Sequence, residues 1–486
     1  MGNKNMSSVL DISNRGYVEA PAGCGKTYLI AETVRDSLGK YLILTHTHSG
    51  VQSLKVKLNT LGVSNSRFYI DTLSSFAYRY ASAYPKISGM SSNQLDYQDM
   101  FHEVFPAAEK FFRSRHGSSI LKNSYTAVLV DEYQDCSIEQ HKLILAITEI
   151  LPCIVFGDSL QAIFNFHGSM VEWSTHVTSN FDKIPFQNIP HRWVNAGSAA
   201  LGEWLLDARM RLIQGLPLNI NQPFINRIDP GTDLQKVTRK ICSNMASLPL
   251  EETIAVLSPD QPRSRYLAQR LGHTYTSIEP IEAPDLFAAA ERLDTAVGAQ
   301  RAYELINFAS RCTTKIGTEL KSILKRLAVG DIEFKNITKH AEARSVIIDV
   351  ARSDDPTFMI NALNTIKKIG YVHRKDMYYG MIRALNIARI SNNKSLRDAV
   401  RSSRRLASIV GRYPLKRVIS YTLLLKGLEF DHVLITEPEK MSKESLYVAL
   451  TRGARTLSII SSTNELVPVD DTQTKGRKQQ QLSLGI

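Results

Sequence analysis

A short glycine-containing segment near the amino terminus constrains this chain more than any other feature. Residues 20–27 read Ala-Pro-Ala-Gly-Cys-Gly-Lys-Thr, after a short apolar run at residues 16–19 and before a helical pattern at residues 28–38. A strand, a glycine loop and a helix in this order form a cradle whose backbone N–H groups can bind phosphate groups at the helix N-terminus. The first position is Ala20, where the strict motif has glycine, so a chance loop is the alternative interpretation.

The loop predicts a defined set of nucleotide contacts. Lys26 would reach the β- and γ-phosphates, and Thr27 would be a ligand of Mg²⁺. The glycines would let the backbone turn its N–H groups inward. The predicted cofactor-binding residues of the loop are therefore Ala22, Gly23, Cys24, Gly25, Lys26 and Thr27.

The five cysteines predict neither a metal site nor a disulfide framework. They are odd in number, lie far apart and have no C-x-x-C spacing, which is typical of reduced core or loop thiols. Cys24 is interpreted as a small residue of the loop, and a redox switch at this position is the alternative.

An acidic pair follows a strand pattern at residues 127–135, Ala-Val-Leu-Val-Asp-Glu-Tyr-Gln-Asp. Open α/β sheets bind ligands outside the carboxyl ends of their strands, where this pair would lie. Asp131 would hold Mg²⁺ directly or through water, and Glu132 would act as a general base on the attacking water. The alternative is that the acids of residues 131–139 serve only the dipole of the following helix. The upstream phosphate loop favours the nucleotide interpretation.

Side chains of three further types are candidates for contact with phosphate groups or with bases. Gln161 follows the apolar run at residues 153–156 and can sense a γ-phosphate. Phe164 and Phe166 can stack on bases, with core packing as the alternative. Arg192 has few acidic neighbours in sequence, which leaves its guanidinium available for phosphate.

Two segments near the carboxyl terminus add candidates. Residues 426–431, Lys-Gly-Leu-Glu-Phe-Asp, form a turn before a strand; we assign Gly427 and Glu429 to nucleotide binding, with Glu429 able to accept from a ribose hydroxyl. Residues 447–455 form a helical segment in which Arg452 could be an arginine finger from a second domain. Taken singly, each arginine also suits a solvated surface position.

The order of strand and helix patterns predicts an α/β fold with parallel sheets. A second α/β pattern opens at residues 252–258, gives way to helical periodicity and resumes near residue 418, which indicates an inserted helical domain. The predicted domains are residues 1–195 with a small helical insertion at 78–122, residues 196–284 with 409–469, a basic helical block at 285–408, and a polar, disordered tail at 470–486.

The net charge of +12 is concentrated in one stretch. Between Lys367 and Arg417, 14 Lys and Arg residues face only two Asp. Such a segment indicates a polyanionic partner, either nucleic acid or an acidic protein face, and Arg401, Arg404 and Arg405 are its candidate contacts. Solvated helix faces are the alternative.

Composition places the chain among ordinary globular proteins. It is 43% hydrophobic and 22% charged. No apolar run approaches the roughly 18 residues of a membrane span, and no signal-peptide pattern begins the chain. We therefore expect a cytoplasmic protein without a membrane partner.

Together and in this order, the motifs resemble those of the UvrD/Rep/PcrA-like branch of superfamily 1 helicases. The matching segments are residues 20–27, 45–49, 71–77, 128–135, 156–168, 191–192, 254–265, 426–430 and 446–455. The resemblance implies an α/β fold of two RecA-like motor domains with parallel sheets and helical insertions. It also implies ATP and Mg²⁺ as cofactors, single-stranded DNA and tailed duplex DNA as partners, and 3′ to 5′ translocation.

The resemblance also implies roles for individual residues. The ATPase site would consist of Lys26, Thr27, Asp131, Glu132, Gln161, Arg192, Glu429 and Arg452. His46, Phe164 and Phe166 occupy the positions of base-stacking aromatic residues, and Thr72 lies in a further segment assigned to DNA contact.

Four departures from the family pattern support an alternative function. No glutamine precedes the phosphate loop, His191 replaces an adenine-stacking tyrosine, His167 replaces an arginine, and Leu423 replaces a histidine. The alternative is a regulatory nucleotide-binding ATPase subunit that controls a partner nuclease with little unwinding. Compact members of this branch occur as the helicase subunit of the Gabija anti-phage system, beside a nuclease. A nuclease activity of this chain has no support, because no further Asp/Glu/Lys cluster with a metal-binding arrangement is evident.

Overall fold

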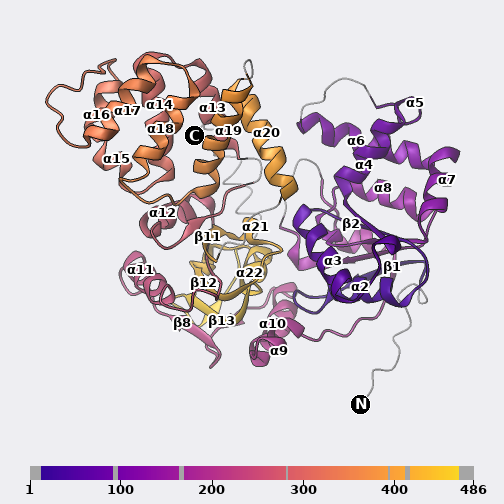
Figure 1. Cartoon of the computed structure of the whole chain (residues 1–486). Coiled ribbons are helices and arrows are strands. Elements are labelled where there is room, and N and C mark those ends of the chain that lie inside the picture. The colour runs from indigo at the N-terminus through magenta and orange to yellow at the C-terminus, as the bar shows by residue number, and fades with distance from the viewer. Residues whose placement is uncertain are drawn as a thin grey trace. The chain divides into compact units, whose positions relative to one another are not determined.

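The computed structural model describes residues 13–90, 97–163, 169–280, 283–391, 395–410 and 416–469, with the backbone alone at 97–102 and 405–410. Its contacts divide the chain into two compact units (Figure 1). Unit 1 comprises Met1–Asn219, Met441–Arg455 and Val467–Ile486, and unit 2 comprises Ile220–Lys440 and Thr456–Leu466. Phe164, Phe166, His167, the tail at 470–486 and the side chain of Arg405 lie outside the described part.

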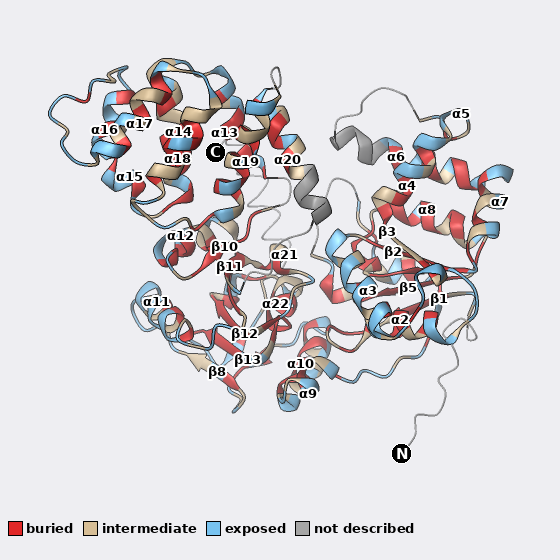
Figure 2. Ribbon diagram, viewed as in Figure 1, coloured by how far each residue is buried: buried red, intermediate tan, exposed pale blue. Residues whose placement is uncertain are grey.

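Unit 1 is built on a sheet with the strand order β3-β2-β4-β5-β1-β6. Its strand pairings are parallel throughout the described register. The strands are β1 (Arg15–Glu19), β2 (Tyr41–Thr45), β3 (Phe68–Thr72), β4 (Ala127–Val130), β5 (Cys153–Gly157) and β6 (Asp182–Lys183). Strands β2, β4 and β5 are buried at every residue, as Figure 2 shows, because helices cover both faces of a parallel sheet.

Two hydrophobic clusters lie on the opposite faces of this sheet. Val128 and Val130 belong to one cluster, and Leu129 between them belongs to the other, as the alternation of side chains along a strand requires. The helices of unit 1 are α2 (Lys26–Asp36), α3 (His48–Thr60), α4 (Leu73–Ala83), α5 (Pro85–Ser88), α6 (Tyr97–Arg113), α7 (Arg115–Ser124), α8 (Ile138–Thr148), α9 (His191–Asn195), α10 (Ala199–Ile213) and α22 (Lys443–Leu450).

The segment predicted as a small helical insertion, residues 78–122, is helical in the described residues. It packs directly onto one face of the sheet through aromatic rings. The ring of Phe112 stacks on Phe76 with centroids 5.5 Å apart, and Tyr84 stacks on Phe111 at 4.7 Å. These rings belong to the same core cluster as β4, so the segment shares the core of unit 1.

Unit 2 contains a second sheet, in the order β10-β11-β9-β12-β13-β8. The strands are β8 (Ile225–Ile228), β9 (Ile254–Ser258), β10 (Thr276–Ser277), β11 (Arg417–Tyr421), β12 (Phe430–Thr436) and β13 (Gly453–Ile460). The described pairings are parallel, and β11 pairs with β9 although more than 150 residues separate them. The predicted α/β class with two parallel sheets is confirmed.

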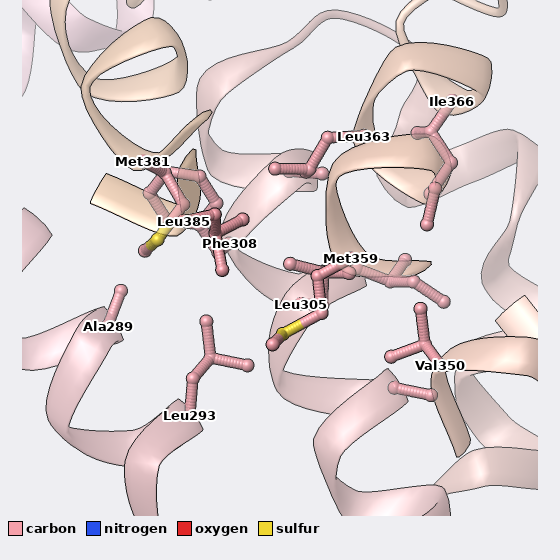
Figure 3. Close-up of a cluster of buried hydrophobic side chains, with 14 of the residues drawn as sticks. Ala289, Leu293, Leu305, Phe308, Val350, Met359, Leu363, Ile366, Met381 and Leu385 are labelled. Carbon is pink, nitrogen blue, oxygen red and sulfur yellow. The ribbon is translucent and has the colours of Figure 1, made fainter. Parts of the chain in front are cut away.

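A helical block interrupts the second sheet between β10 and β11, as the sequence predicts. Its helices are α13 (Pro284–Thr295), α14 (Gly298–Cys312), α15 (Ile316–Glu319), α16 (Lys321–Leu327), α17 (Ala341–Arg352), α18 (Pro356–Ile366), α19 (Lys375–Ile390) and α20 (Leu396–Val410). The remaining helices of unit 2 are α11 (Leu234–Met245), α12 (Gln261–Leu271) and α21 (Thr422–Leu425). Figure 3 shows Leu305, Leu363 and Leu385 in the apolar core of the block, which contains no residue of the sheet.

A buried ion pair joins the helical block to the rest of unit 2. The Arg374 guanidinium donates from Nε and Nη2 to the two carboxylate oxygens of Glu279, at 2.6 and 2.7 Å. Asp285, at the start of α13, accepts from the same guanidinium at 2.7 Å. Since a buried charge is costly without its partner, this pair strongly favours one arrangement of the block on unit 2.

The contact-based units differ from the predicted domain boundaries in three places, one of which is the short segment 467–469, found in unit 1. Residues 196–219 and α22 belong to unit 1 by their contacts, whereas the sequence predicts them in the second domain. The physical reason is that α10 packs against both α9 and α22. The four-part division itself stays a prediction. No helix in the described part of the chain combines the length and apolarity needed to cross a membrane.

Candidate nucleotide-binding site

The phosphate loop connects β1 to α2 in unit 1. Gly23 and Gly25 have φ angles of 71° and 95°, in the left-handed region that favours glycine. A Cβ atom at Gly23 would also lie 2.6 Å from the ring of Trp193, so this position excludes any side chain. Lys26 is the first residue of α2, and its Nζ donates to the carbonyl oxygen of Ala20 at 2.9 Å. The ammonium group therefore lies over the loop, and Thr27 follows it half-buried in the first turn.

Cys24 is an inert member of this loop. Its side chain is buried, and burial raises the pKa of the thiol to about 11, although Lys26 acts in the opposite direction. Because the thiolate is the reactive form of cysteine, a thiol held protonated near neutral pH is a poor redox switch. The small-residue interpretation is the one that these properties favour.

Asp131 and Glu132 follow β4 at the carboxyl edge of the same sheet. Asp131 is 6% exposed and its backbone N–H donates to Leu44 on the neighbouring strand at 2.8 Å. Burial and, secondly, the neighbouring Glu132 raise the pKa of Asp131, Lys26 partly offsets both, and the resulting pKa is about 7. Glu132 has a φ angle of 56°, which is uncommon for a residue other than glycine. The Glu132 carboxylate accepts a hydrogen bond from Gln134 Nε2, and its role as a general base stays a prediction.

A carboxylate that the sequence analysis did not single out lies at the centre of the site. Asp158 directly follows β5 and is fully buried. It accepts hydrogen bonds from the Ala22 N–H at 3.2 Å, Gln161 Nε2 at 2.9 Å, Tyr447 Oη at 3.0 Å and Arg209 Nε at 2.9 Å. Burial alone raises the pKa of Asp158, but Arg209 and then Lys26 outweigh it and lower the pKa below its ordinary value. Asp158 is therefore an ionised hub that joins four segments of unit 1.

Helix α9 connects the phosphate loop to the end of α22. Arg192 Nη1 donates to the carbonyl oxygen of Thr451 at 2.6 Å, and Trp193 Nε1 donates to that of Gly453 at 2.8 Å. Trp193 is 1% exposed and packs against Gly23 on its other side. A single tryptophan thus contacts both the phosphate loop and the residues that follow α22.

Arg452 lies at this same end of α22. It is 2% exposed; its Nε donates to the carbonyl oxygen of Val448 at 2.9 Å, and its Nη2 donates to Thr451 Oγ1 at 3.0 Å. Arg192 and Arg452 therefore meet at Thr451. Unit 1 brings together the phosphate loop, the acidic pair, Gln161 and both arginines, although the sequence spaces them over more than 400 residues.

Comparison with known protein families finds a match for one segment of unit 1. Residues 88–182 match the family model of the UvrD/REP helicase N-terminal domain. This segment contains Asp131, Glu132, Asp158 and Gln161. This part of the chain is therefore similar to the N-terminal domain of UvrD/REP helicases. No curated protein is detectably similar to it. Among solved structures, a Pif1 helicase from Candida albicans matches with a TM-score of 0.38 and 11% identity over 98% of this chain and 100% of that one.

Two residues that the sequence analysis assigns to nucleotide binding lie in unit 2. Gly427 has a φ angle of 78°, which explains the need for glycine in the turn before β12. Glu429 follows it and is exposed. Their role in nucleotide binding stays a prediction.

The DNA-contact candidates in unit 1 have defined surroundings. Thr72 is 4% exposed and caps α4, with its Oγ1 accepting from the Ser75 N–H at 3.1 Å. His46 is half-buried, with Nε2 3.5 Å from the thiol of Cys136. Thr72 therefore has a structural role in α4, and DNA contact by either residue stays a prediction.

The basic candidates on α20 are partly engaged with the protein. Arg401 Nη1 lies 3.1 Å from a carboxylate oxygen of Asp398, and Arg404 Nη2 donates to the carbonyl oxygen of Pro280 at 3.2 Å. Exposed ion pairs such as Arg401–Asp398 contribute little to the stability of the fold, so the arginine can exchange its carboxylate partner for a phosphate group at little cost. Arg401 is the better placed of the two for a polyanion.

Sequence reasoning missed Asp158, Arg209, Tyr447 and Trp193. A carboxylate directly after the strand β5 was a usable signal for Asp158, since the same logic identified Asp131. Arg209, in contrast, occupies an ordinary position in an amphipathic helix. Only the packing of α10 against the site distinguishes it.

Proposed function

We propose that this chain is an ATP-dependent translocase or helicase on single-stranded DNA, which moves 3′ to 5′ and couples hydrolysis to unwinding. The observation that carries the proposal is the convergence in unit 1 of a phosphate loop, two carboxyl-edge acids and two arginines. The similarity of residues 88–182 to the UvrD/REP helicase N-terminal domain supports DNA as the substrate on which such an ATPase would act.

The loop and the acids have complementary tasks in hydrolysis. Backbone N–H groups of residues 22–27 and the Lys26 ammonium would bind the triphosphate. Thr27 and Asp131 would hold Mg²⁺, which when bound neutralises charge developing on the β- and γ-phosphate oxygens. The buried Asp131 suits this task, because its carboxyl group lacks a full countercharge of its own. Glu132 would orient and deprotonate the attacking water, and Gln161 would contact the γ-phosphate.

The arginines would complete the transition-state environment. Charge accumulates on the transferring phosphoryl group, and preorganised guanidinium groups stabilise it in a site that excludes water. Arg192 and Arg452 suit this task, since both guanidinium groups contact Thr451 and the Arg192 backbone N–H also donates to the carbonyl oxygen of Gly23 in the phosphate loop.

The alternative function is a regulatory ATPase subunit that controls a partner nuclease, as in a Gabija-type anti-phage system. The observation that favours it is His191, which replaces the family's adenine-stacking tyrosine and lies beside the loop, 3.4 Å from a Cβ built on Gly25. Strand displacement on a 3′-tailed duplex distinguishes the two: a motor separates the strands, and a regulatory subunit does not. The nuclease partner, the anti-phage role and the cytoplasmic location stay predictions.

The decisive test is ATP hydrolysis by the purified chain with and without single-stranded DNA. We expect the steady-state rate of ATP hydrolysis to rise on addition of DNA, because binding of DNA to a translocase favours the closed conformation in which the catalytic site is complete. Hydrolysis that is indifferent to DNA would contradict the motor function while leaving the ATPase intact.

Charge reversal on α20 tests the polyanion contact. We expect Arg401→Glu combined with Arg404→Glu to weaken tailed-duplex binding and to reduce the slope of log affinity against log salt by roughly two, one for each lost phosphate contact. Fluorescence anisotropy between low and moderate salt measures both quantities. The matched control is Arg344→Glu, on α17 of the same block, and equal slopes in all three proteins would favour the solvated-face interpretation.

A further inference from the structure

Arg209 is a buried arginine in unit 1 that no nucleotide motif includes. It lies on α10 and is 7% exposed. Its Nε donates to Asp158 at 2.9 Å, and its Nη2 donates to Glu19 at 2.7 Å. Ser159 lies in the same group, with its hydroxyl donating to Glu19 at 2.6 Å. One guanidinium thus bridges the carboxylate of the last residue of β1 and that of the residue that follows β5.

These two carboxylates both lie next to the phosphate loop. Glu19 is the last residue of β1, so it directly precedes the phosphate loop. Asp158 accepts from the N–H of Ala22, inside the loop. The loop is therefore fixed at its start and near its middle by two anions, and Arg209 joins them.

Helix α22 is part of the same arrangement. The Tyr447 hydroxyl donates to Asp158 at 3.0 Å and accepts from the Ala22 N–H at 3.1 Å. Any displacement of Asp158 would therefore move a loop amide and the helix that precedes Arg452. A guanidinium has the fork geometry to hold two carboxylates at once, whereas an ammonium is a point charge.

We propose that Arg209 is a positioning residue for ATP hydrolysis. By binding both Asp158 and Glu19, it holds the phosphate loop and α22 in a fixed position relative to each other. The inference rests on the proposed ATPase function and adds to it a residue that does not touch the nucleotide. It also explains why a fully buried aspartate can occupy the centre of the site, since Arg209 supplies the charge that keeps it ionised.

The test compares Arg209→Gln and Arg209→Lys with wild type in ATP hydrolysis over a range of pH. We expect Arg209→Gln to lower kcat by roughly 10- to 100-fold, because small misplacements of a catalytic site have effects of this size. The acid limb of its pH profile should move to higher pH. Two cations face Asp158 in the wild type, Lys26 on α2 and Arg209 on α10, and only Lys26 would remain in the variant. Glu19 disfavours the ionised form of Asp158, and the Tyr447 hydroxyl stays neutral, so Asp158 would be protonated at a higher pH.

The lysine variant separates charge from geometry. Arg209→Lys should keep the acid limb near that of wild type, since the positive charge remains, and should recover only part of kcat, since the fork is lost. Arg115→Gln, an exposed arginine on α7, is the matched control and should behave as wild type.

Two results would overturn the inference, and a third would contradict the function on which it rests. Wild-type kcat and an unmoved acid limb in a folded Arg209→Gln would overturn it, and so would full kcat in Arg209→Lys if the glutamine variant does not fold. An inactive wild type would instead contradict the proposed function itself, so the two failures are distinguishable.

Discussion

Replacing Arg452 with alanine is expected to lower kcat for ATP hydrolysis by about 10³-fold while leaving nucleotide affinity nearly unchanged. The physical reason is that an arginine finger stabilises charge that develops only in the transition state. In the described structure, the Arg452 guanidinium is held by Val448 and Thr451 at the end of α22, on the residue that Arg192 also contacts. Single-turnover hydrolysis together with binding of a fluorescent ADP analogue measures the two quantities separately.

Two controls accompany this variant. Arg455→Ala removes an exposed arginine three residues away and should retain wild-type activity. Lys26→Ala should lose ATP hydrolysis, because it removes the phosphate-binding ammonium group of the loop. If Lys26→Ala is inactive but Arg452→Ala is fully active, Arg452 has no part in the chemistry and the site is confined to the loop and its acids. Thermal unfolding of each variant identifies effects that come from lost packing of a buried side chain.

Replacing Glu132 with glutamine is expected to reduce kcat by about 10³-fold and to leave nucleotide binding intact. An amide has nearly the same shape as the carboxylate but cannot accept a proton from the attacking water. Binding should persist because Glu132 is placed for the water, whereas Lys26 and the loop hold the phosphates. Stopped hydrolysis with retained binding of labelled ATP is the expected signature.

The control for this prediction is Glu139→Gln. Helix α8 begins after Ser137, which forms a capping box with Gln140, and Glu139 lies in its first turn. Glu139 can therefore serve the helix dipole, whereas Glu132 precedes the helix and has a left-handed backbone. Equal loss of activity in both variants would contradict the general-base assignment and favour a purely structural role for these acids.

Much of the fold could be predicted because the pattern of this chain is strongly periodic. The fully apolar runs at residues 41–44, 127–130 and 153–156 are β2, β4 and β5, since a strand buried on both faces of a parallel sheet needs no polar alternation. The helical block was equally evident, because its apolar positions recur at helical spacing and pack into a core of their own.

The assignment of α22 could not be predicted in the same way. Its sequence indicates a helix before a strand of the second sheet, and β13 does pair with β8 in unit 2. The helix itself nevertheless packs within unit 1, through Tyr447 and the contacts of Arg192. The hydrogen-bond partners of the buried Tyr447 hydroxyl come from segments that are distant in the sequence. The local periodicity of α22 carries no information about them.

The sequence by itself determined the chemistry available to this protein: a loop that can adopt left-handed glycine conformations, acids directly after apolar strands, and arginines in segments that contain few acids. These features depend on neighbouring residues, so a linear pattern records them. Only the tertiary structure decided that Asp158, Arg209 and Glu19 form one charged group around the phosphate loop. That group depends on three segments approaching within hydrogen-bond distance in a buried environment, where the energy of each charge is determined by its partners rather than by its position in the chain.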